Sequence, residues 1–533
     1  MTDELYVLPA SFGQRRLWLA EQARPDTSLY TMSTALRLRG ALDVSALQRA
    51  LTEVVSRHEV LRSVLRLTGT EVSQVVRAPE PLKITVVEVG GGMDAVVAEA
   101  ERLAAVPFDL GAGPLLRCHL LRAGEDDHVL QLVVHHSVVD GESTQVLLAE
   151  LTALYAAFVE GTEPELPELP LQYADYALWQ QGRLDSGALD EQLEYWRERL
   201  AGLGELRLPA DHARPATPTF ASTTAPVKIP AAAIRRLREA VGAGVTAPMI
   251  ALAAYAVVLA RWSGQDDVVV AVPVGGRTEV ELEPLIGFFV NTVAVRVDLS
   301  GDPSFEAVLR QVRDASVAAY ARADLPFEHL VEQLQPERRA GVLPIAQTML
   351  TVQPSAVAGG FAIPGVAAEP VALAQDRLVF DVKLDVAELD DALSGVLIGR
   401  TELFDPDTIA LAARSFTNVL RSAATAPGTA VSALPCPIAG RTGVSTVEEA
   451  AAPVAAGTGD GTPASPAEHL LVRLWREVLE LDEVGVDDEF YASGGNSLRA
   501  VRIVMQAREV GVELPMTVLL GEHTIRQLAA ALQ

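Results

Sequence analysis

One stretch of the chain limits how the rest can fold. Residues 437–465 are rich in alanine, glycine, threonine and proline and have no sustained apolar period, a composition typical of a flexible tether. The residues before this stretch alternate between helix and strand patterns, whereas residues 466–533 have only helical patterns. A chain of 533 residues is also too long for a single hydrophobic core. We therefore predict a large α/β region, a linker and a small helical domain.

The α/β region divides near residue 180, where a proline-broken segment gives way to a helical pattern. Its longest apolar run, residues 247–260, is short for a membrane span and predicts a buried core helix. Apolar, β-branched runs predict strands at 128–134, 266–274, 290–299 and 378–389. The predicted domains are an N-lobe (1–180), a C-lobe (181–436), the linker (437–465) and the helical domain (466–533).

The charge and the cysteines exclude several classes of function. A net charge of −27 argues against nucleic acid or an anionic membrane as the main partner. Cys118 and Cys436 lie far apart and form neither a metal-type spacing nor a disulfide framework, which fits a reducing cytoplasm. The first residues lack a basic start followed by an apolar block, so we expect no signal peptide. These features predict a cytoplasmic protein.

The segment HHSVVDG, residues 135–141, carries the strongest chemical signal. It follows a predicted strand and leads through Gly141 into a helical pattern over residues 142–158. Neighbouring side chains in an extended segment point in opposite directions, so one of His135 and His136 should face the core and the other a cavity. Glycine lets the backbone approach a ligand closely, and the N–H groups of a helix start can face negative charge that develops on a substrate oxygen.

The residues alone leave more than one interpretation of this segment open. Asp140 needs a partner if the turn is buried, and an arginine is the expected one. The alternative to a catalytic site is a satisfied core histidine beside a turn aspartate. A metal site is disfavoured, because no third ligand stands at a recognisable spacing.

HHxxxDG resembles the signature of the condensation domains of nonribosomal peptide synthetases, and further segments are similar to that family in the expected order. The resemblance covers about residues 5–436. Gly13 stands where the family usually has alanine, and Glu142 stands where it usually has tryptophan. The similar segments are SFGQRRLWL (11–19), RHEVLRSVL (57–65), YADYALW (173–179), GQDDVVVAVPVGGR (264–277), IGFFVNTVAVR (286–296) and DLPFE (324–328).

A serine in the helical domain is the second chemical signal. Ser497 follows Gly494 and Gly495 and opens a helical pattern. The local alternative is a serine N-cap after a glycine turn. The whole domain resembles a peptidyl carrier domain, whose GGxS serine bears 4′-phosphopantetheine. A phosphodiester at a helix N-terminus is electrostatically favourable, so the resemblance and the local physics agree.

Together the two resemblances imply a condensation–carrier didomain. It would form an amide bond between a carrier-bound acyl or peptidyl thioester and the amine of a carrier-bound aminoacyl group. The implied fold is α/β, with two chloramphenicol-acetyltransferase-like lobes in a V and a small four-helix carrier domain.

The resemblance also implies a role for each residue of the site. His136 would orient the amine and shuttle a proton, and the Gly141 backbone would stabilise the oxyanion. Asp140 would pair with Arg277, and His135 would support the loop. No metal takes part in this scheme.

The order of the domains leaves no room for an adenylation domain, which normally lies between condensation and carrier domains. Either a trans-acting adenylating enzyme loads Ser497, or the arm serves a specialised route. The other implied partners are an upstream donor carrier protein and a phosphopantetheinyl transferase, within antibiotic or other secondary metabolism. Two alternatives belong to the same superfamily. An epimerisation domain is disfavoured by RHEVLR and GFFVNT, and a non-catalytic recruitment platform is disfavoured by the intact histidine motif.

Overall fold

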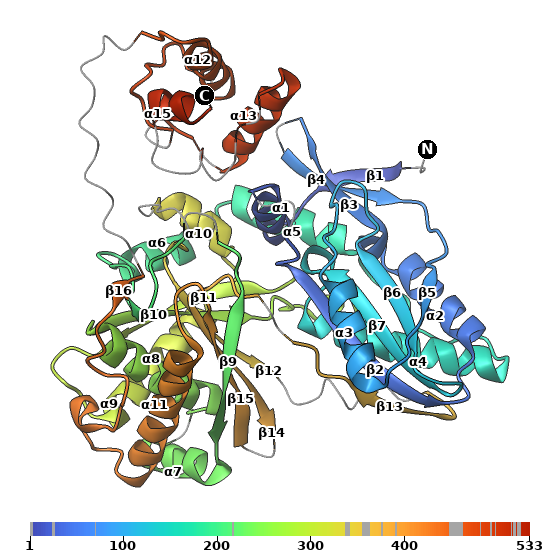
Figure 1. Ribbon diagram of the computed structural model, residues 1–533, viewed down its shortest axis with the longest axis horizontal. Helices are drawn as coiled ribbons and strands as arrows, with labels where there is room; N and C mark the ends of the chain where they lie inside the picture. Colours follow the sequence, from blue (N-terminus) through green and yellow to red (C-terminus); the bar gives the residue numbers. More distant parts are fainter. Residues whose placement is uncertain are drawn as a thin grey trace.

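The computed structural model shows two α/β lobes and a smaller helical unit at the end of the chain (Figure 1). No helix in the described part of the chain is long and apolar enough to span a bilayer. The described residues are 4–23, 27–69, 71–215, 218–242, 244–335, 342–353, 363–374, 377–389, 392–446, 462–479, 481–490, 493–495, 497–512, 514, 519 and 524–532.

The N-lobe is built on a five-stranded sheet in the order β13-β2-β7-β6-β5. Its central strand β7 is the strand predicted at 128–134, and every residue from His128 to His135 is buried. The burial follows from helices on both faces: α2 and α4 pack on one side and α3 on the other. The strands are β13 (Val366–Pro370), β2 (Thr31–Gly40), β7 (Asp127–His135), β6 (Leu116–Arg122) and β5 (Ile84–Glu88).

A smaller sheet, in the order β1-β4-β3, completes the N-lobe together with helices α1 and α5. The strands of this sheet are β1 (Glu4–Pro9), β4 (Glu71–Arg77) and β3 (Ser63–Thr68). The helices of the lobe are α1 (Phe12–Ala23), α2 (Val44–Arg57), α3 (Met93–Ala104), α4 (Gly141–Glu160) and α5 (Tyr173–Asp185), with the short 3₁₀ turns η1 (Glu59–Arg62) and η2 (His136–Val138).

The C-lobe has a six-stranded sheet in the order β11-β10-β12-β14-β15-β9. Helix α8 (Ala247–Ser263) is buried along nearly its whole length, which confirms the core helix predicted at 247–260. The strands are β9 (Ser222–Ile229), β10 (Asp267–Val274), β11 (Asn291–Asp298), β12 (Thr348–Gln353), β14 (Val382–Leu389) and β15 (Ala392–Arg400). The other helices and turns are α6 (Asp190–Arg199), α7 (Ala231–Val241), α9 (Phe305–Tyr320), α10 (Phe327–Leu334), α11 (Pro406–Thr425), η3 (Val280–Leu282) and η5 (Val431–Ala433).

The two lobes exchange segments of chain, which the sequence did not predict. Strand β13, from the C-lobe part of the sequence, pairs with β2 at the edge of the N-lobe sheet. The segment before β11 also crosses over, because Ile286, Phe288 and Phe289 are part of the N-lobe core. These crossings bring C-lobe residues next to the end of β7.

The C-terminal part is helical where it is described, with α12 (Pro466–Leu479), α13 (Ser497–Glu509) and α15 (Ile525–Ala531). The fourth helix expected there lies outside the described residues. Helix α13 lies beside α1 of the N-lobe (Figure 1).

The segment predicted as a linker begins within packed structure. Ile438 is fully buried in the C-lobe core, and β16 (Val444–Ser445) pairs with β8 (Pro209–Ala210). Packing therefore extends to residue 446, beyond the predicted lobe end at 436. Residues 447–461 of the predicted linker lie outside the described residues.

Candidate active site at the end of strand β7

His135 ends strand β7 and holds the turn that follows. Its Nδ1 accepts the backbone N–H of Ser137 at 3.2 Å and lies 2.8 Å from the Ser137 hydroxyl. Because Nδ1 accepts, the proton of the neutral ring is on Nε2, which lies 3.4 Å from Oε1 of the buried Glu21. The edge of the ring also meets Phe108. His135 is therefore occupied within the N-lobe core.

His136 begins the turn η2 and has different partners. Its backbone N–H donates to the Tyr30 carbonyl at 2.8 Å, and its ring Nδ1 lies 2.7 Å from the Val139 carbonyl oxygen. A carbonyl only accepts, so Nδ1 carries the proton and Nε2 of the neutral ring keeps its lone pair. The ring packs against Phe288 and stays partly accessible. The two adjacent histidines thus face different surroundings.

The surroundings of His136 favour the neutral ring. Burial lowers the pKa of His136 below its ordinary value, and the positive charge of Arg16 acts in the same direction. The Val139 hydrogen bond and the charge of Asp140 oppose this lowering. The net direction leaves Nε2 unprotonated and able to accept a hydrogen bond near neutral pH.

Asp140 is fully buried, and hydrogen bonds surround its carboxylate. It caps helix α4 by accepting the Ser143 N–H at 2.7 Å, and it accepts the Phe289 N–H at 3.0 Å. Arg277 donates to both of its oxygens, at 3.0 Å and 3.2 Å. Both charges are thus removed from water and paired with each other, which is the condition for a tolerable buried ion pair, although Arg277 Nε is buried without a hydrogen-bond partner.

Arg277 comes from the C-lobe, directly after β10, and so joins the two lobes at this point. Besides Asp140, it donates to the Ser143 hydroxyl at 2.7 Å and to the Leu285 carbonyl at 3.1 Å. Its guanidinium lies 4.2 Å from the centre of the Phe289 ring. The structure therefore brings the predicted residues Asp140 and Arg277 together in a clamp between the lobes.

Gly141 is the first residue of helix α4, where the leading N–H groups have no carbonyl within the helix to bind. A Cβ added at Gly141 would meet nothing within 4 Å. The space beside this backbone is therefore open to a ligand. Glu142, the next residue, is 57% exposed and lies 3.3 Å from Arg277.

Residues that the sequence did not single out hold the turn in place. Gln14 donates its amide to the Ser137 carbonyl at 3.2 Å. The Tyr173 hydroxyl lies 2.7 Å from Ser11 Oγ and donates to the Phe288 carbonyl at 2.7 Å. All four of these residues, Ser11, Gln14, Tyr173 and Phe288, fall in segments that resemble family motifs. Their position in those motifs was the only sequence signal that could have identified them.

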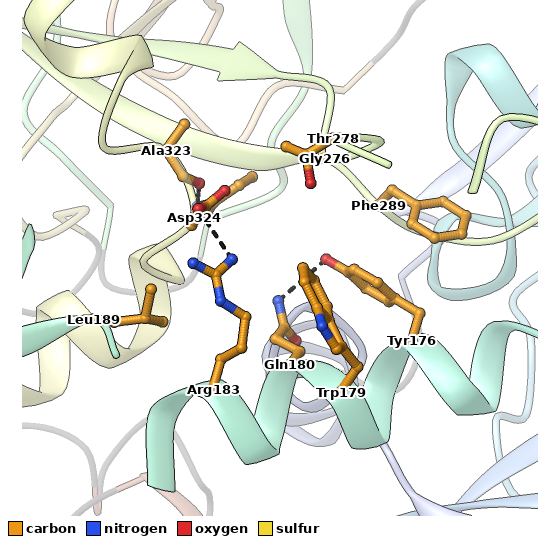
Figure 2. Close-up of a pocket in the computed structure, with 11 residues that line it drawn as sticks. Tyr176, Trp179, Gln180, Arg183, Leu189, Gly276, Thr278, Phe289, Ala323 and Asp324 are labelled. Atoms are coloured by element: carbon orange, nitrogen blue, oxygen red, sulfur yellow. Dashed lines mark hydrogen bonds and ion pairs between the residues drawn. The ribbon is translucent and has the colours of Figure 1, made fainter. Parts of the chain in front are cut away.

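A small cavity lies between α5 and the C-lobe, next to the same clamp (Figure 2). Arg183 reaches across it to Asp324 at 3.0 Å, and Phe289 forms part of its wall. Its volume of about 20 Å³ suits a water molecule rather than a substrate. The residues that line it are Tyr176, Trp179, Gln180, Arg183, Leu189, Gly276, Thr278, Phe289, Asn291, Ala323 and Asp324.

Ser497 lies far along the chain from this site, at the start of helix α13. Gly494 before it has a φ of 85°, and a Cβ at Gly495 would come within 2.5 Å of the Phe490 carbonyl oxygen. Both glycines are therefore required by the backbone. Arg499 donates to the Gly494 carbonyl at 2.7 Å and fixes the turn. Among the described residues, no cluster of histidine, cysteine or carboxylate side chains could hold a metal ion.

Comparison with known proteins identifies two families along the chain. Residues 5–437 match the condensation domain, and residues 469–532 match the phosphopantetheine attachment site. Chondramide synthase cmdD of Chondromyces crocatus is 41% identical over 79% of this chain and 11% of its own length. Phosphinothricin tripeptide synthetase PhsC of Streptomyces viridochromogenes is 38% identical over 84% of this chain and 42% of its own length. The chain thus spans only a part of the curated relatives it matches.

Solved structures agree with this match. The X-domain from teicoplanin biosynthesis, known alone and in complex with OxyB, has a TM-score of 0.75 and 33% identity. The match with the isolated X-domain covers 82% of this chain and 99% of the X-domain chain. A holo four-domain nonribosomal peptide synthetase shares the fold, with a TM-score of 0.73 and 20% identity. The match covers 96% of this chain and 39% of the synthetase chain. The predicted fold class, two chloramphenicol-acetyltransferase-like lobes with a helical carrier domain, is confirmed.

Proposed function

Because this chain belongs to the condensation-domain family and carries a phosphopantetheine attachment domain, we propose that it forms an amide bond. The donor is an acyl or peptidyl thioester on an upstream carrier protein. The acceptor is the amine of an aminoacyl group on a carrier arm. The observation that supports this proposal best is the hydrogen bond from His136 Nδ1 to the Val139 carbonyl, which leaves Nε2 as an acceptor in the turn that leads into helix α4.

His136 orients the attacking amine in this proposal. An α-amine has a pKa of roughly 8, so a useful fraction is neutral near pH 7 and needs no strong base. Nε2 accepts one N–H of the amine and directs its lone pair toward the thioester carbonyl carbon. As the C–N bond forms, the amine gains positive charge, and Nε2 takes the proton and passes it to the departing thiolate.

Gly141 stabilises the negative charge on the carbonyl oxygen. Its backbone begins helix α4, where unpaired N–H groups and the helix dipole favour an anion. The open space at its missing side chain gives the oxygen access. Asp140 and Arg277 have a structural role, because their mutual hydrogen bonds are buried and use both carboxylate oxygens. His135 supports the turn through Ser137.

Ser497 is the proposed attachment residue for 4′-phosphopantetheine, which supplies the thiol that carries the aminoacyl group. The start of α13 fits a phosphodiester, because the N–H groups there attract negative charge. The two constrained glycines before it keep side chains away from the approach. A phosphopantetheinyl transferase would modify Ser497, and a trans-acting adenylating enzyme would supply its cargo. The free, buried thiols of Cys118 and Cys436 support a cytoplasmic location.

A second candidate function is the recruitment of a partner enzyme without catalysis. It is favoured by the likeness to the X-domain from teicoplanin biosynthesis, which has been solved in complex with OxyB. In that case His136 would have no chemical task. Epimerisation is a third possibility within the superfamily, and no observation on the site favours it.

The experiment that separates these functions is a condensation assay with a loaded donor carrier and the loaded chain. We expect His136→Ala to lower the rate of amide formation strongly while donor-carrier binding, measured by surface plasmon resonance, stays as in the parent. Product formation by His136→Ala at the parent rate would exclude the proposed mechanism. An inactive parent that still binds a partner enzyme would favour recruitment.

A further inference from the structure

Phe288 packs against the ring of His136, and the proposed mechanism gives it no role. Its ring centre lies 4.8 Å from that of His136, with the two planes at 69°. This edge-to-face geometry is a favourable one for two rings. Phe288 is only 4% exposed, so its ring has little freedom to leave this position.

The backbone that carries Phe288 is held on both sides. Ser143 and Gly287 exchange two hydrogen bonds, from the Ser143 hydroxyl to the Gly287 carbonyl at 2.7 Å and from the Gly287 N–H to that hydroxyl at 2.9 Å. The Tyr173 hydroxyl donates to the Phe288 carbonyl, and the next N–H, of Phe289, donates to Asp140. The Phe288 ring therefore projects from a rigid segment, and it can act as a fixed wall.

Gly13 explains how the ring fits. A Cβ at Gly13 would come within 2.7 Å of two carbons of the Phe288 ring. Gly13 lies within helix α1 and not at a positive φ, so its backbone does not require glycine. Glycine also weakens a helix relative to alanine. The ring of Phe288 takes up the space that a side chain at this position would need.

Arg16, one turn further along α1, adds a link to the C-lobe. Its guanidinium lies 5.9 Å from the Phe288 ring centre, and it forms an ion pair with Glu328 of α10 at 2.9 Å. The ring of Phe288 is thus enclosed between α1 and His136. From these contacts we infer that Phe288 is a positioning residue for His136, with its ring seated against the bare backbone of Gly13.

This inference depends on the proposed function. It means that two contacts restrain the orientation of the His136 imidazole. The Val139 carbonyl fixes Nδ1, and the T-shaped packing with Phe288 fixes the plane of the imidazole. Together they set the direction of the Nε2 lone pair. Loss of the second restraint should spoil orientation in the reacting complex and leave carrier binding unaffected.

The test is steady-state condensation by the full chain, with loaded carriers, for five variants and the parent. We expect Phe288→Leu to lower kcat by about 10- to 100-fold, the effect of misplacing a reacting group by about 1 Å, with little change in KM. Gly13→Ala should lower kcat similarly, because its Cβ displaces the ring. The double variant should be no slower than Phe288→Leu alone, since leucine leaves room for the added methyl.

Phe108→Leu is the matched control. Phe108 is also a buried ring, and it packs edge-on against His135 at 5.9 Å instead of His136. We expect this variant to lose thermal stability and to keep the parent kcat. Phe288→Met, which retains most of the volume, replaces Phe288→Leu if the latter fails to fold. Nitrogen-15 NMR of the His136 ring should show the Nδ1–H tautomer in the parent and in Phe288→Leu alike, because the Val139 carbonyl fixes that tautomer and Phe288 does not.

His136→Ala is the reference that separates the two proposals. If His136→Ala is inactive and Phe288→Leu keeps the parent kcat, the positioning role is excluded and the proposed function stands. If His136→Ala is itself as active as the parent, the proposed function fails first. An equal loss of kcat in Phe108→Leu and Phe288→Leu would also exclude a specific role for Phe288.

Discussion

At the scale of single residues, two adjacent histidines have separate tasks because the chain turns between them. His135 is the last residue of β7, and its ring lies in the N-lobe core against Glu21 and Ser137. His136 begins a 3₁₀ turn that is tied to Val139. The His135 ring is occupied by hydrogen bonds within the N-lobe, whereas Nε2 of His136 keeps its lone pair. The proposed chemistry depends on that difference.

Removal of the buried Asp140 carboxylate should lower the stability of the fold, without a direct effect on the chemical step. Asp140→Ala leaves Arg277, whose side chain is 5% exposed, without its counter-charge, and we expect a loss of about 3–5 kcal/mol in the free energy of unfolding. The measurement is urea denaturation followed by circular dichroism. Asp127→Ala is the control, because the Asp127–Arg37 pair is 30% exposed on both sides and should contribute no more than about 1 kcal/mol. An Asp140→Ala protein that is as stable as the parent, yet inactive, would give Asp140 a chemical role.

The sequence predicted the residues of the candidate site, but it did not predict the residues that hold them in place. Asp140 in a buried turn required an arginine on general grounds, but only the family resemblance pointed to Arg277, and the structure places the two together. Gln14, Tyr173 and Phe288 act through contacts between distant segments, which no local pattern reveals. Phe288 in particular is an apolar residue in an apolar run, so its contact with His136 depends on the tertiary fold alone.

At the scale of elements, the strands that are buried on both faces were the easiest to predict. The run at 128–134 became β7, and the run at 266–274 became β10 (Asp267–Val274), because branched apolar residues in short runs have few other stable arrangements. Strand β13 was missed. Its residues Val366–Pro370 include glutamate and end in proline, and it forms a strand because the edge of β2 in the other lobe offers hydrogen bonds.

The start of helix α13 gives a prediction at this scale. Incubation of the chain with coenzyme A and a phosphopantetheinyl transferase should add one phosphopantetheine arm, and Ser497→Ala should prevent the addition. Intact-protein mass spectrometry measures both. Ser493→Ala is the control, since Ser493 lies four residues earlier and its hydroxyl donates to the Glu489 carbonyl at 2.8 Å. A mass increase in Ser497→Ala, or its loss in Ser493→Ala, would assign the arm to another residue.

At the scale of the whole molecule, the lobes are joined at several places around the end of β7. The buried Asp140–Arg277 clamp is at the centre, and the pairs Arg16–Glu328 and Arg183–Asp324 lie farther out. The segment 286–289 crosses into the N-lobe core. The groups proposed to act on the substrate, His136 and Gly141, belong to the N-lobe. Residues from the C-lobe part of the sequence, Arg277 and Phe289, hold the turn between them through Asp140.

The neutral state of His136 is what links this architecture to the mechanism. Burial lowers the pKa of His136, so the ring stays unprotonated over the pH range in which an α-amine, with a pKa of roughly 8, loses its proton. The rate should then follow the titration of the amine. A general base would instead contribute about 10²–10⁴-fold and follow its own titration.

The most direct measurement is single-turnover condensation between a loaded donor carrier and acceptor amines of graded pKa, with the parent and His136→Ala. If His136 orients an already neutral amine, His136→Ala should lower the rate by a similar factor for every amine, and the pH profile should remain that of the amine. If a lower amine pKa restores His136→Ala to near the parent rate, His136 acts mainly as a base, and the orienting role is contradicted.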